Sequence, residues 1–129
     1  ELAFPGQPYS RVKGLKEWNF GKFEGASEDL NPRLPYGDFF KQYGGEGEVE
    51  LRERLMATIT DIMRRPGHES VLAVSHGAAT AQVMRAVGVE PLDMKERIGN
   101  CCVLTLDFDP QTERFAFADL YNPYGTPRA

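Results

Sequence analysis

The sequence predicts an α/β fold built as a single domain. Apolar residues recur every three or four positions between residues 48 and 65, which is typical of an amphipathic helix. A continuous apolar run, Val71–Val74, indicates a strand that is covered on both faces. Apolar and polar residues alternate over Cys102–Phe108, which is typical of a strand with one buried face. This succession of helices and strands favours an α/β sandwich.

Residues 1–46 are expected to be irregular, because glycine and proline are frequent among them. Only one helical turn is predicted there, around Asp38–Tyr43. A compact domain rarely contains so long an irregular segment unless that segment builds or covers a site. We therefore divide the single domain, residues 1–129, into an active-site loop region (1–46) and a helix-strand-helix-strand-strand core (47–129).

The first element of this core is a helix over residues 48–65. Its apolar stripe consists of Leu51, Leu55, Ile59 and Ile62. A Pro-Gly pair follows directly and ends the helix, because proline cannot continue the hydrogen-bond pattern.

The elements after the Val71–Val74 strand are a second helix and a C-terminal hairpin. Residues 77–87 are predicted as helix, and a short helix is expected over Pro91–Ile98. The strand within Cys102–Phe108 is followed by another over Phe115–Leu120. The residues between them, Asp109–Glu113, predict a hairpin turn.

The Val71–Val74 strand needs sheet neighbours on both sides, but the other convincing strands form the C-terminal hairpin. We therefore expect it to lack a partner on one side. The chain also begins with Glu1 rather than with methionine, which is not normally removed before glutamate. Both observations lead us to expect that N-terminal strands of the fold are missing from this sequence.

Charge and composition exclude several classes of function. The net charge is -4 and no basic run is present, so no nucleic-acid partner is expected. No apolar run approaches the roughly 20 residues of a membrane span, so no membrane partner is expected either. The only cysteines, Cys101 and Cys102, are adjacent, which predicts no disulfide framework and favours the reducing cytoplasm as location.

His76 lies where the predicted strand ends and the next helix begins. Open α/β sheets bind ligands at this end of a strand. The first helical turn, from Gly77 and Ala78, offers free N–H groups and the positive end of the helix dipole to an anion. His76, Gly77 and Ala78 are therefore candidate phosphate-binding residues. The alternative is a histidine bound only by backbone groups at a strand end.

A second candidate segment, Leu15–Gly25, reads LKEWNFGKFEG. It holds two carboxylates, Glu17 and Glu24, among aromatic residues in a glycine-rich loop. Apolar surroundings favour the protonated form of a carboxyl group, which a general acid requires. The alternative is a loop anchored by its aromatic residues, with both acids exposed to solvent.

Together these segments resemble the histidine phosphatase superfamily, with its phosphoglycerate-mutase-like fold. The family pattern L-x-E-x-x-F-G-x-W-E-G is similar to LKEWNFGKFEG. A G-G-E followed eight residues later by arginine is matched by Gly44–Glu46 and Arg54, and a strand ending in S-H-G by Ser75–Gly77. The segment IGNCCVLTL, with Asn100 as turn residue, is similar to a late strand of the family. These motifs occur in the family's order over nearly all of the chain.

The resemblance implies a three-layer α/β sandwich and phosphoryl transfer without a metal or other cofactor. In the family, the histidine of an R-H-G motif accepts the phosphoryl group and two arginines bind it. The histidine that matches His76 contacts the phosphate and stabilises the transferring charge. The glutamate that matches Glu17 protonates the leaving group and then activates water. His76 and Glu17 are therefore the expected catalytic residues, and a small phosphorylated metabolite is the expected substrate.

The resemblance also favours phosphomonoester hydrolysis over a phosphoglycerate mutase reaction. Mutases of this type tend to carry extra basic residues after the glutamate, whereas here Trp18 follows Glu17.

The chain departs from the family in one respect that bears on catalysis, because it contains no R-H-G. Its histidines are His68 and His76, and only His76 lies in a family motif. We therefore expect the chain to be the C-terminal part of a family member, incomplete at its N-terminal strands and inactive as it stands. The alternative is a non-catalytic module that binds an anion or forms a homodimer through an exposed sheet edge.

Overall fold

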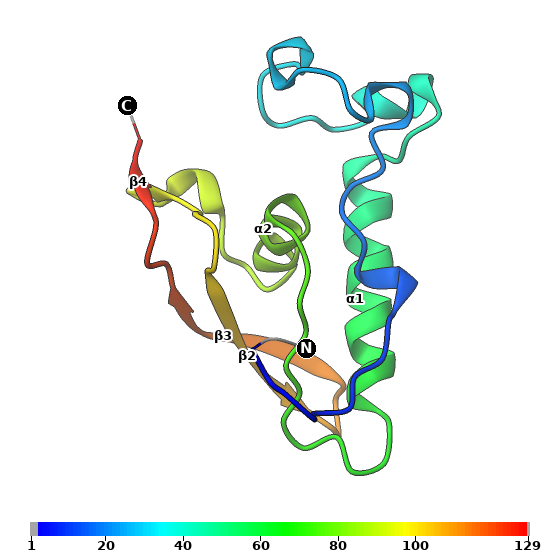
Figure 1. Ribbon diagram of the computed structural model, residues 1–129, viewed down its shortest axis with the longest axis vertical. Helices are drawn as coiled ribbons and strands as arrows, with labels where there is room; N and C mark the ends of the chain where they lie inside the picture. Colours follow the sequence, from blue (N-terminus) through cyan, green and yellow to red (C-terminus); the bar gives the residue numbers. More distant parts are fainter. Residues whose placement is uncertain (1–2, 129) are drawn as a thin grey trace.

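The computed structural model describes residues 3–128 and has a mixed α/β fold, as the sequence predicts (Figure 1). The loop region carries the 3-10 helices η1 (Lys13–Leu15), η2 (Gly21–Phe23), η3 (Glu28–Leu30) and η4 (Phe39–Tyr43). The core carries the helices α1 (Glu48–Met63), α2 (Gly77–Ala86) and η5 (Pro91–Asp93), and the strands β1 (Glu96–Arg97), β2 (Val103–Asp109), β3 (Arg114–Tyr121) and β4 (Thr126–Pro127). Within residues 3–128, no helix combines the length and the apolar character needed to cross a membrane.

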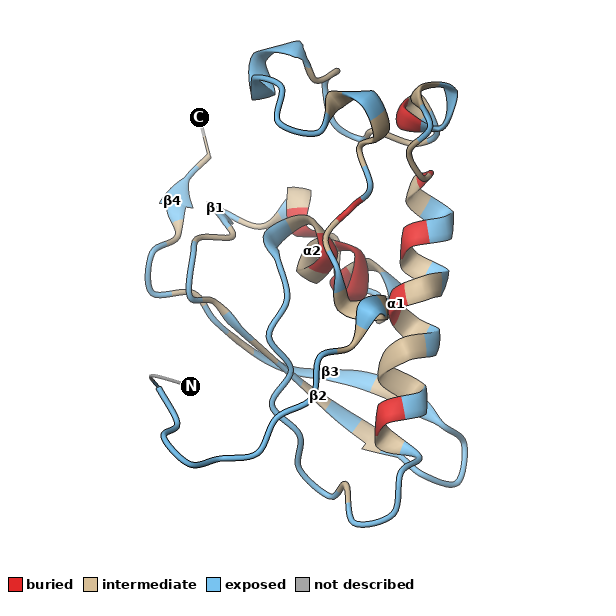
Figure 2. Cartoon of the chain, turned by 45° about the vertical axis from the view of Figure 1, so that its right-hand side comes forward, coloured by how far each residue is buried: buried red, intermediate tan, exposed pale blue. Residues whose placement is uncertain are grey.

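The hydrophobic core lies between α1, α2 and the loop that precedes them (Figure 2). Its buried members are Trp18, Phe40, Leu51, Leu55, Ala79 and Val83. The predicted helix at residues 48–65 is confirmed as α1, and three of its four stripe residues are buried. Burial of a leucine or isoleucine side chain contributes about 1.5–3 kcal/mol, so the α1–α2 contact is a principal source of stability.

The C-terminal hairpin closes one side of this core. Strands β2 and β3 pair antiparallel, and the inward side chains of Leu104 and Leu106 pack against the core cluster. The predicted turn is confirmed, because the Glu113 N–H donates to the Asp109 carbonyl at 2.7 Å. Strands β1 and β4 form a separate two-stranded antiparallel sheet.

The prediction of a buried strand at Val71–Val74 is wrong. The segment runs without regular secondary structure between α1 and α2 (Figure 1). The side chains of Val71, Leu72 and Val74 are 39%, 64% and 82% exposed. The strands among residues 3–128 pair as β1 with β4 and β2 with β3, so none of them lines up beside this segment. An apolar run favours burial, but a strand also needs a neighbour that accepts its backbone hydrogen bonds.

The helix predicted over Pro91–Ile98 is shorter than expected. Only η5 is helical, because Glu96 and Arg97 pair with Pro127 and Thr126 as β1 and β4.

Candidate active site

Helix α2 begins at His76 without a capping side chain of its own. His76 has extended backbone angles (φ -131°, ψ 168°), and its carbonyl accepts hydrogen bonds from the N–H and the hydroxyl of Thr80. Its imidazole makes no capping bond to the helix and is exposed. The N–H groups of the first turn therefore need an acceptor from elsewhere in the chain.

Glu17 supplies that acceptor. Its Oε2 accepts from the Ala78 N–H at 3.0 Å, and its Oε1 accepts from the Ala79 N–H at 2.8 Å. The same Oε1 also accepts from the Trp18 N–H at 2.9 Å. A carboxylate in this position satisfies the donors that an N-cap side chain would satisfy, which is worth about 0.5–2 kcal/mol. Glu17 thus fastens the loop region to the start of α2.

The two residues predicted to be catalytic therefore meet at one end of one helix. The Glu17 carboxylate binds the second and third residues after His76, although 59 positions separate the two in the sequence. Of the predicted phosphate-binding N–H groups, that of Ala78 is bound by Glu17, while no described residue accepts from that of Gly77. A Cβ built on Gly77 would meet nothing within 4 Å. An anion could approach this end of α2 from the solvent.

The backbone around Glu17 is held by Arg54 of α1. The Arg54 guanidinium donates to the carbonyls of Gly14, Lys16 and Glu17 at 2.8, 3.1 and 3.2 Å. The Ser75 hydroxyl donates to the Leu15 carbonyl at 2.7 Å. This hydrogen bond from Ser75 connects the loop to the segment that precedes His76.

Glu46 completes this arrangement. Its carboxylate accepts from Arg54 Nη2 at 2.5 Å and from Nε at 3.2 Å. It also accepts from the Asn19 N–H at 3.0 Å, and the Glu46 carbonyl accepts from Trp18 Nε1 at 2.8 Å. Both Glu46 and Arg54 match a motif that the sequence shares with the family. The structure connects them to Glu17. Their spacing of eight residues, which places Glu46 beside the second turn of α1, was the sequence feature from which this contact could have been predicted.

An aromatic cluster fixes the rest of the loop. Trp18 is 3% exposed and packs edge-on against Tyr36 and Phe40, with ring centroids 5.4 and 6.1 Å apart. Each such contact adds about 0.5–1.5 kcal/mol to the area that it buries. Because adjacent residues point in different directions, the buried Trp18 ring leaves Glu17 free to face α2.

Glu24 and His68 do not reach the site in this structure. Glu24 is exposed, and its carboxylate accepts from the Phe20 N–H at 2.9 Å, so its hydrogen bond is made within its own loop. The His68 ring is half-buried, and its Nδ1 is hydrogen-bonded to the Ile62 carbonyl at 2.7 Å. Within residues 3–128, no cluster of three or more histidine, cysteine or acidic side chains is arranged to hold a metal ion.

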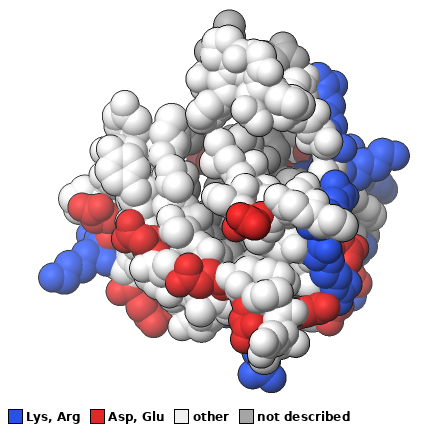
Figure 3. Space-filling model, turned by 90° about the horizontal axis from the view of Figure 1, so that it is seen from below, with Lys and Arg blue, Asp and Glu red and all other residues white. Residues whose placement is uncertain are grey.

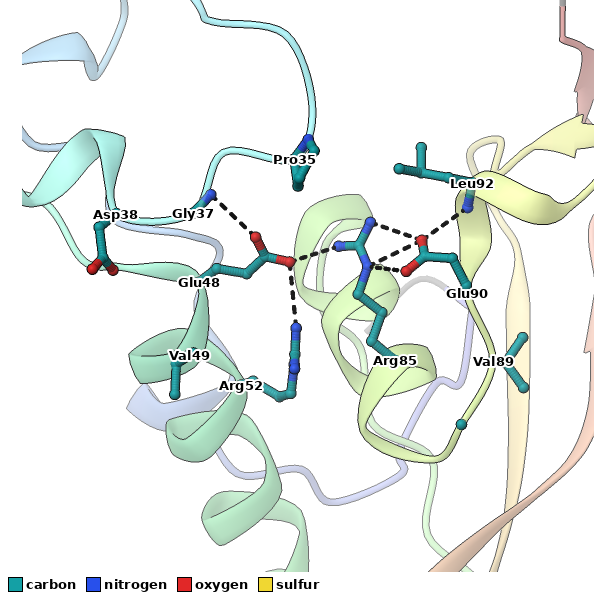
Figure 4. A pocket seen from close by; sticks show the side chains of 11 residues that line it. Pro35, Gly37, Asp38, Glu48, Val49, Arg52, Arg85, Val89, Glu90 and Leu92 are labelled. Carbon is teal, nitrogen blue, oxygen red and sulfur yellow. Dashed lines mark hydrogen bonds and ion pairs between the residues drawn. The ribbon is translucent and has the colours of Figure 1, made fainter.

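A charged pocket occupies the opposite end of α2 (Figure 4). Arg85 is only 12% exposed and binds Glu90 with Nε at 2.9 Å and Glu48 with Nη1 at 3.2 Å. Glu48 also accepts from Arg52 and from the buried amide of Gln82. The hydrogen bond from Arg85 and that from the Leu92 N–H lower the pKa of Glu90 below its ordinary value. Each arginine is thus paired with a glutamate, and Arg85 lies in this pocket and not beside His76.

The sequence model of the histidine phosphatase superfamily (branch 1) matches residues 2–119. The chain belongs to the histidine phosphatase superfamily. Comparisons with curated proteins and with solved structures give no match. Membership of this superfamily supports phosphoryl transfer as the general chemistry.

Seen from below in Figure 3, the upper part of the molecule is largely uncharged except along its right edge. Most of the lysine and arginine side chains visible in this view lie along its right edge, with others at the left and the bottom, and the acidic side chains lie across its middle and lower part.

Proposed function

We propose that this histidine phosphatase family member takes part in the hydrolysis of small phosphomonoesters through His76 and Glu17. The observation that carries the proposal is the pair of hydrogen bonds from the Ala78 and Ala79 N–H groups to Glu17. They bring the matching glutamate of the family to the helix end where the matching histidine lies. Because Cys101 and Cys102 are both free thiols, we propose the cytoplasm as the location.

The proposed reaction has two steps. A nucleophilic imidazole forms a bond to phosphorus, the bond to the leaving oxygen breaks, and Glu17 donates its proton to that oxygen. Water then attacks the phosphorus of the phosphohistidine, the phosphorus–nitrogen bond breaks, and the free imidazole is released. The Glu17 carboxylate accepts a proton from the water as inorganic phosphate forms. His76 and the Gly77 N–H donate hydrogen bonds to the phosphoryl oxygens and stabilise their charge.

The nucleophilic histidine of this proposal lies outside the 129 residues, which contain no R-H-G. We propose that a strand carrying it pairs with Val71–Val74. The backbone of this segment makes no hydrogen bond to any residue of the described range 3–128, and its side chains are exposed. It also leads directly to His76, so a paired strand would end beside the proposed site. By this proposal the chain alone is inactive.

Hydrolysis is proposed over a mutase reaction because of the residue that follows Glu17. Trp18 is buried and bonded to the Glu46 carbonyl, so it offers no positive charge to a second phosphate or carboxylate of a substrate. Conversion of 3-phosphoglycerate to 2-phosphoglycerate by the active form would overturn this part of the proposal.

The test uses an extended form of the chain, in which an added N-terminal segment supplies a strand with an R-H-G motif. The rates of hydrolysis of p-nitrophenyl phosphate and of glycerol 2-phosphate are measured. Glu17→Gln should lower kcat for glycerol 2-phosphate by about 10²–10⁴, the usual contribution of a general acid. The loss should be much smaller for p-nitrophenyl phosphate, because nitrophenolate leaves without protonation. His76→Ala should lower kcat for both substrates.

Glu24→Gln is the matched control, since Glu24 lies in the same loop but bonds only to the Phe20 N–H. It should leave both rates unchanged. Equal losses for the two substrates in Glu17→Gln would show that Glu17 is not the proton donor. Absence of hydrolysis in every extended form would reject the proposed function.

The same exposed segment supports a second candidate, a homodimer formed by strand pairing. Unpaired backbone groups next to apolar side chains favour addition of a strand from another chain. Sedimentation of the 129-residue chain over a range of concentrations should then show a dimer, and Val74→Lys should give a monomer. A monomer for both proteins at all concentrations would exclude the homodimer.

A further inference from the structure

The guanidinium of Arg54 is fully engaged by the residues around Glu17. Its hydrogen bonds go to three loop carbonyls, of Gly14, Lys16 and Glu17, and to both oxygens of Glu46. The Arg54 and Glu46 side chains are 27% and 16% exposed. Five donors that meet five acceptors in a partly buried place fix the path of the loop backbone.

The contacts of Glu46 hold the other side of Glu17. The Glu46 carboxylate binds the Asn19 N–H, its carbonyl binds the Trp18 indole, and its own N–H donates to the Asn19 carbonyl at 2.9 Å. Arg54 thus fixes the backbone up to Glu17, and Glu46 fixes the backbone directly after it. The Glu17 side chain extends from this support to the Ala78 and Ala79 N–H groups.

We propose that Arg54, acting together with Glu46, is a positioning residue that holds the Glu17 carboxylate at the start of α2. Arg54 itself touches neither His76 nor the exposed Gly77 N–H in this structure, so its effect passes through the loop. The catalytic consequence rests on the proposed function of Glu17, whereas the positioning itself does not.

The geometry requires arginine at this position. Lysine carries the same charge, but its ammonium has three donors at one point and cannot reach three carbonyls and both oxygens of Glu46 together. Arg54→Lys should therefore keep the charge balance and the fold while it releases the loop carbonyls. This separates positioning from a general need for a positive charge.

The test follows the amide ¹H and ¹⁵N shifts of Ala78 and Ala79 in the 129-residue chain during a titration with acid. In the original chain these amides should respond to protonation of Glu17, and in Glu17→Gln the response should be lost. In Arg54→Lys the response should be reduced or lost, although the α1 and α2 amides keep their dispersion. Glu46→Gln should have the same effect in weaker form, because one oxygen still accepts from Arg54.

Arg85→Lys is the matched control, since Arg85 also binds two glutamates but lies at the other end of α2. It should leave the Ala78 and Ala79 response unchanged. If Arg54→Lys retains the full response while only the melting temperature falls, Arg54 is merely structural and the proposal is overturned. If Arg54→Lys unfolds the chain, Glu46→Gln carries the test, and an unchanged response there overturns the proposal equally.

Activity supplies a second, separable readout. In the extended, active form, Arg54→Lys should lower kcat for glycerol 2-phosphate by about 10–100-fold with little change in KM, because a small displacement of a proton donor costs this much. The loss should be smaller for p-nitrophenyl phosphate, as for Glu17→Gln. Failure of all extended forms to hydrolyse either substrate would reject the proposed function and leave the amide result standing.

Discussion

Two apolar segments of this chain have opposite environments. In α1, Leu51 and Leu55 are 0% and 1% exposed, whereas in the Val71–Val74 segment Leu72 and Val74 are 64% and 82% exposed. Leu51 and Leu55 of the α1 stripe pack in the core cluster with residues of α2 and of the aromatic loop. The second segment lies a few residues before α2, yet nothing in residues 3–128 pairs with its backbone.

The difference follows from where each element finds partners for its backbone hydrogen bonds. A helix satisfies its hydrogen bonds internally, so α1 needs only one apolar surface to pack against. A strand satisfies them through neighbours, so Val71–Val74 remains open until another strand arrives. The packed region and the open segment can thus be compared by matched substitutions.

The largest expected difference is between Leu55→Ala and Leu72→Ala. Leu55→Ala should lower the free energy of unfolding by about 2–5 kcal/mol, through lost burial and the cavity that remains. Leu72→Ala should change it by less than about 0.5 kcal/mol, because the side chain is already exposed. Urea unfolding followed by circular dichroism measures both. A loss of similar size in Leu72→Ala would mean that the segment is covered in solution.

A smaller difference is expected between Gly21→Ala and Gly77→Ala. A Cβ on Gly21 would lie 2.2 Å from the Tyr43 carbonyl oxygen, and its φ of +58° disfavours alanine. We expect a loss of about 1–3 kcal/mol, since backbone must shift. A Cβ on Gly77 meets nothing within 4 Å, so its substitution should change stability by less than about 0.5 kcal/mol.

Gly77→Ala also probes the proposed anion site. If an anion contacts the Gly77 N–H closely, the added methyl group should weaken vanadate binding to the chain without loss of stability. Calorimetric titration measures the binding. Unchanged binding would place the anion elsewhere.

The smallest expected effect is on how stability changes as the pH is lowered. The pKa of Glu90 is lowered chiefly by its hydrogen bond with Arg85, and the pKa of Glu113 chiefly by its hydrogen bond with Arg64. A lowered pKa in the folded state means that each carboxylate stabilises the fold above its ordinary value of 4.5. That stability is lost as pH falls through the lowered folded-state value.

Glu90→Gln and Glu113→Gln should each make the melting temperature fall less steeply on acidification below about pH 4.5. Both carboxylates are partly exposed, so each change should be small. Glu90 belongs to the pocket at the end of α2, and Glu113 joins the hairpin to α1. A change of slope in Glu90→Gln alone would show that the Arg64–Glu113 pair does not persist in solution.

Much of the fold was predictable because its signals are local. The stripe and the Pro-Gly stop located α1, the small residues after His76 located the start of α2, and alternation located β2. The prediction of a strand at Val71–Val74 was wrong for a physical reason. A run of apolar residues indicates that burial is favourable, but it does not provide the neighbouring strand that would bury it. The helix predicted over Pro91–Ile98 ends early, as η5, for a similar reason. The residues after it pair as β1 with β4, which lies far away in the sequence.

The sequence by itself determined the family motifs, the helices α1 and α2 and the two residues proposed as catalytic, since each depends on residue type and short spacing. Only the tertiary structure decided that Glu17 caps α2, that Arg54 and Glu46 hold the loop behind it, and that Arg85 belongs to a different pocket. The bonds of Glu17 to α2, of Arg54 to the loop carbonyls and of Arg85 to Glu48 join residues 37 to 62 positions apart. Which donor meets which acceptor at such a distance depends on how the helices pack.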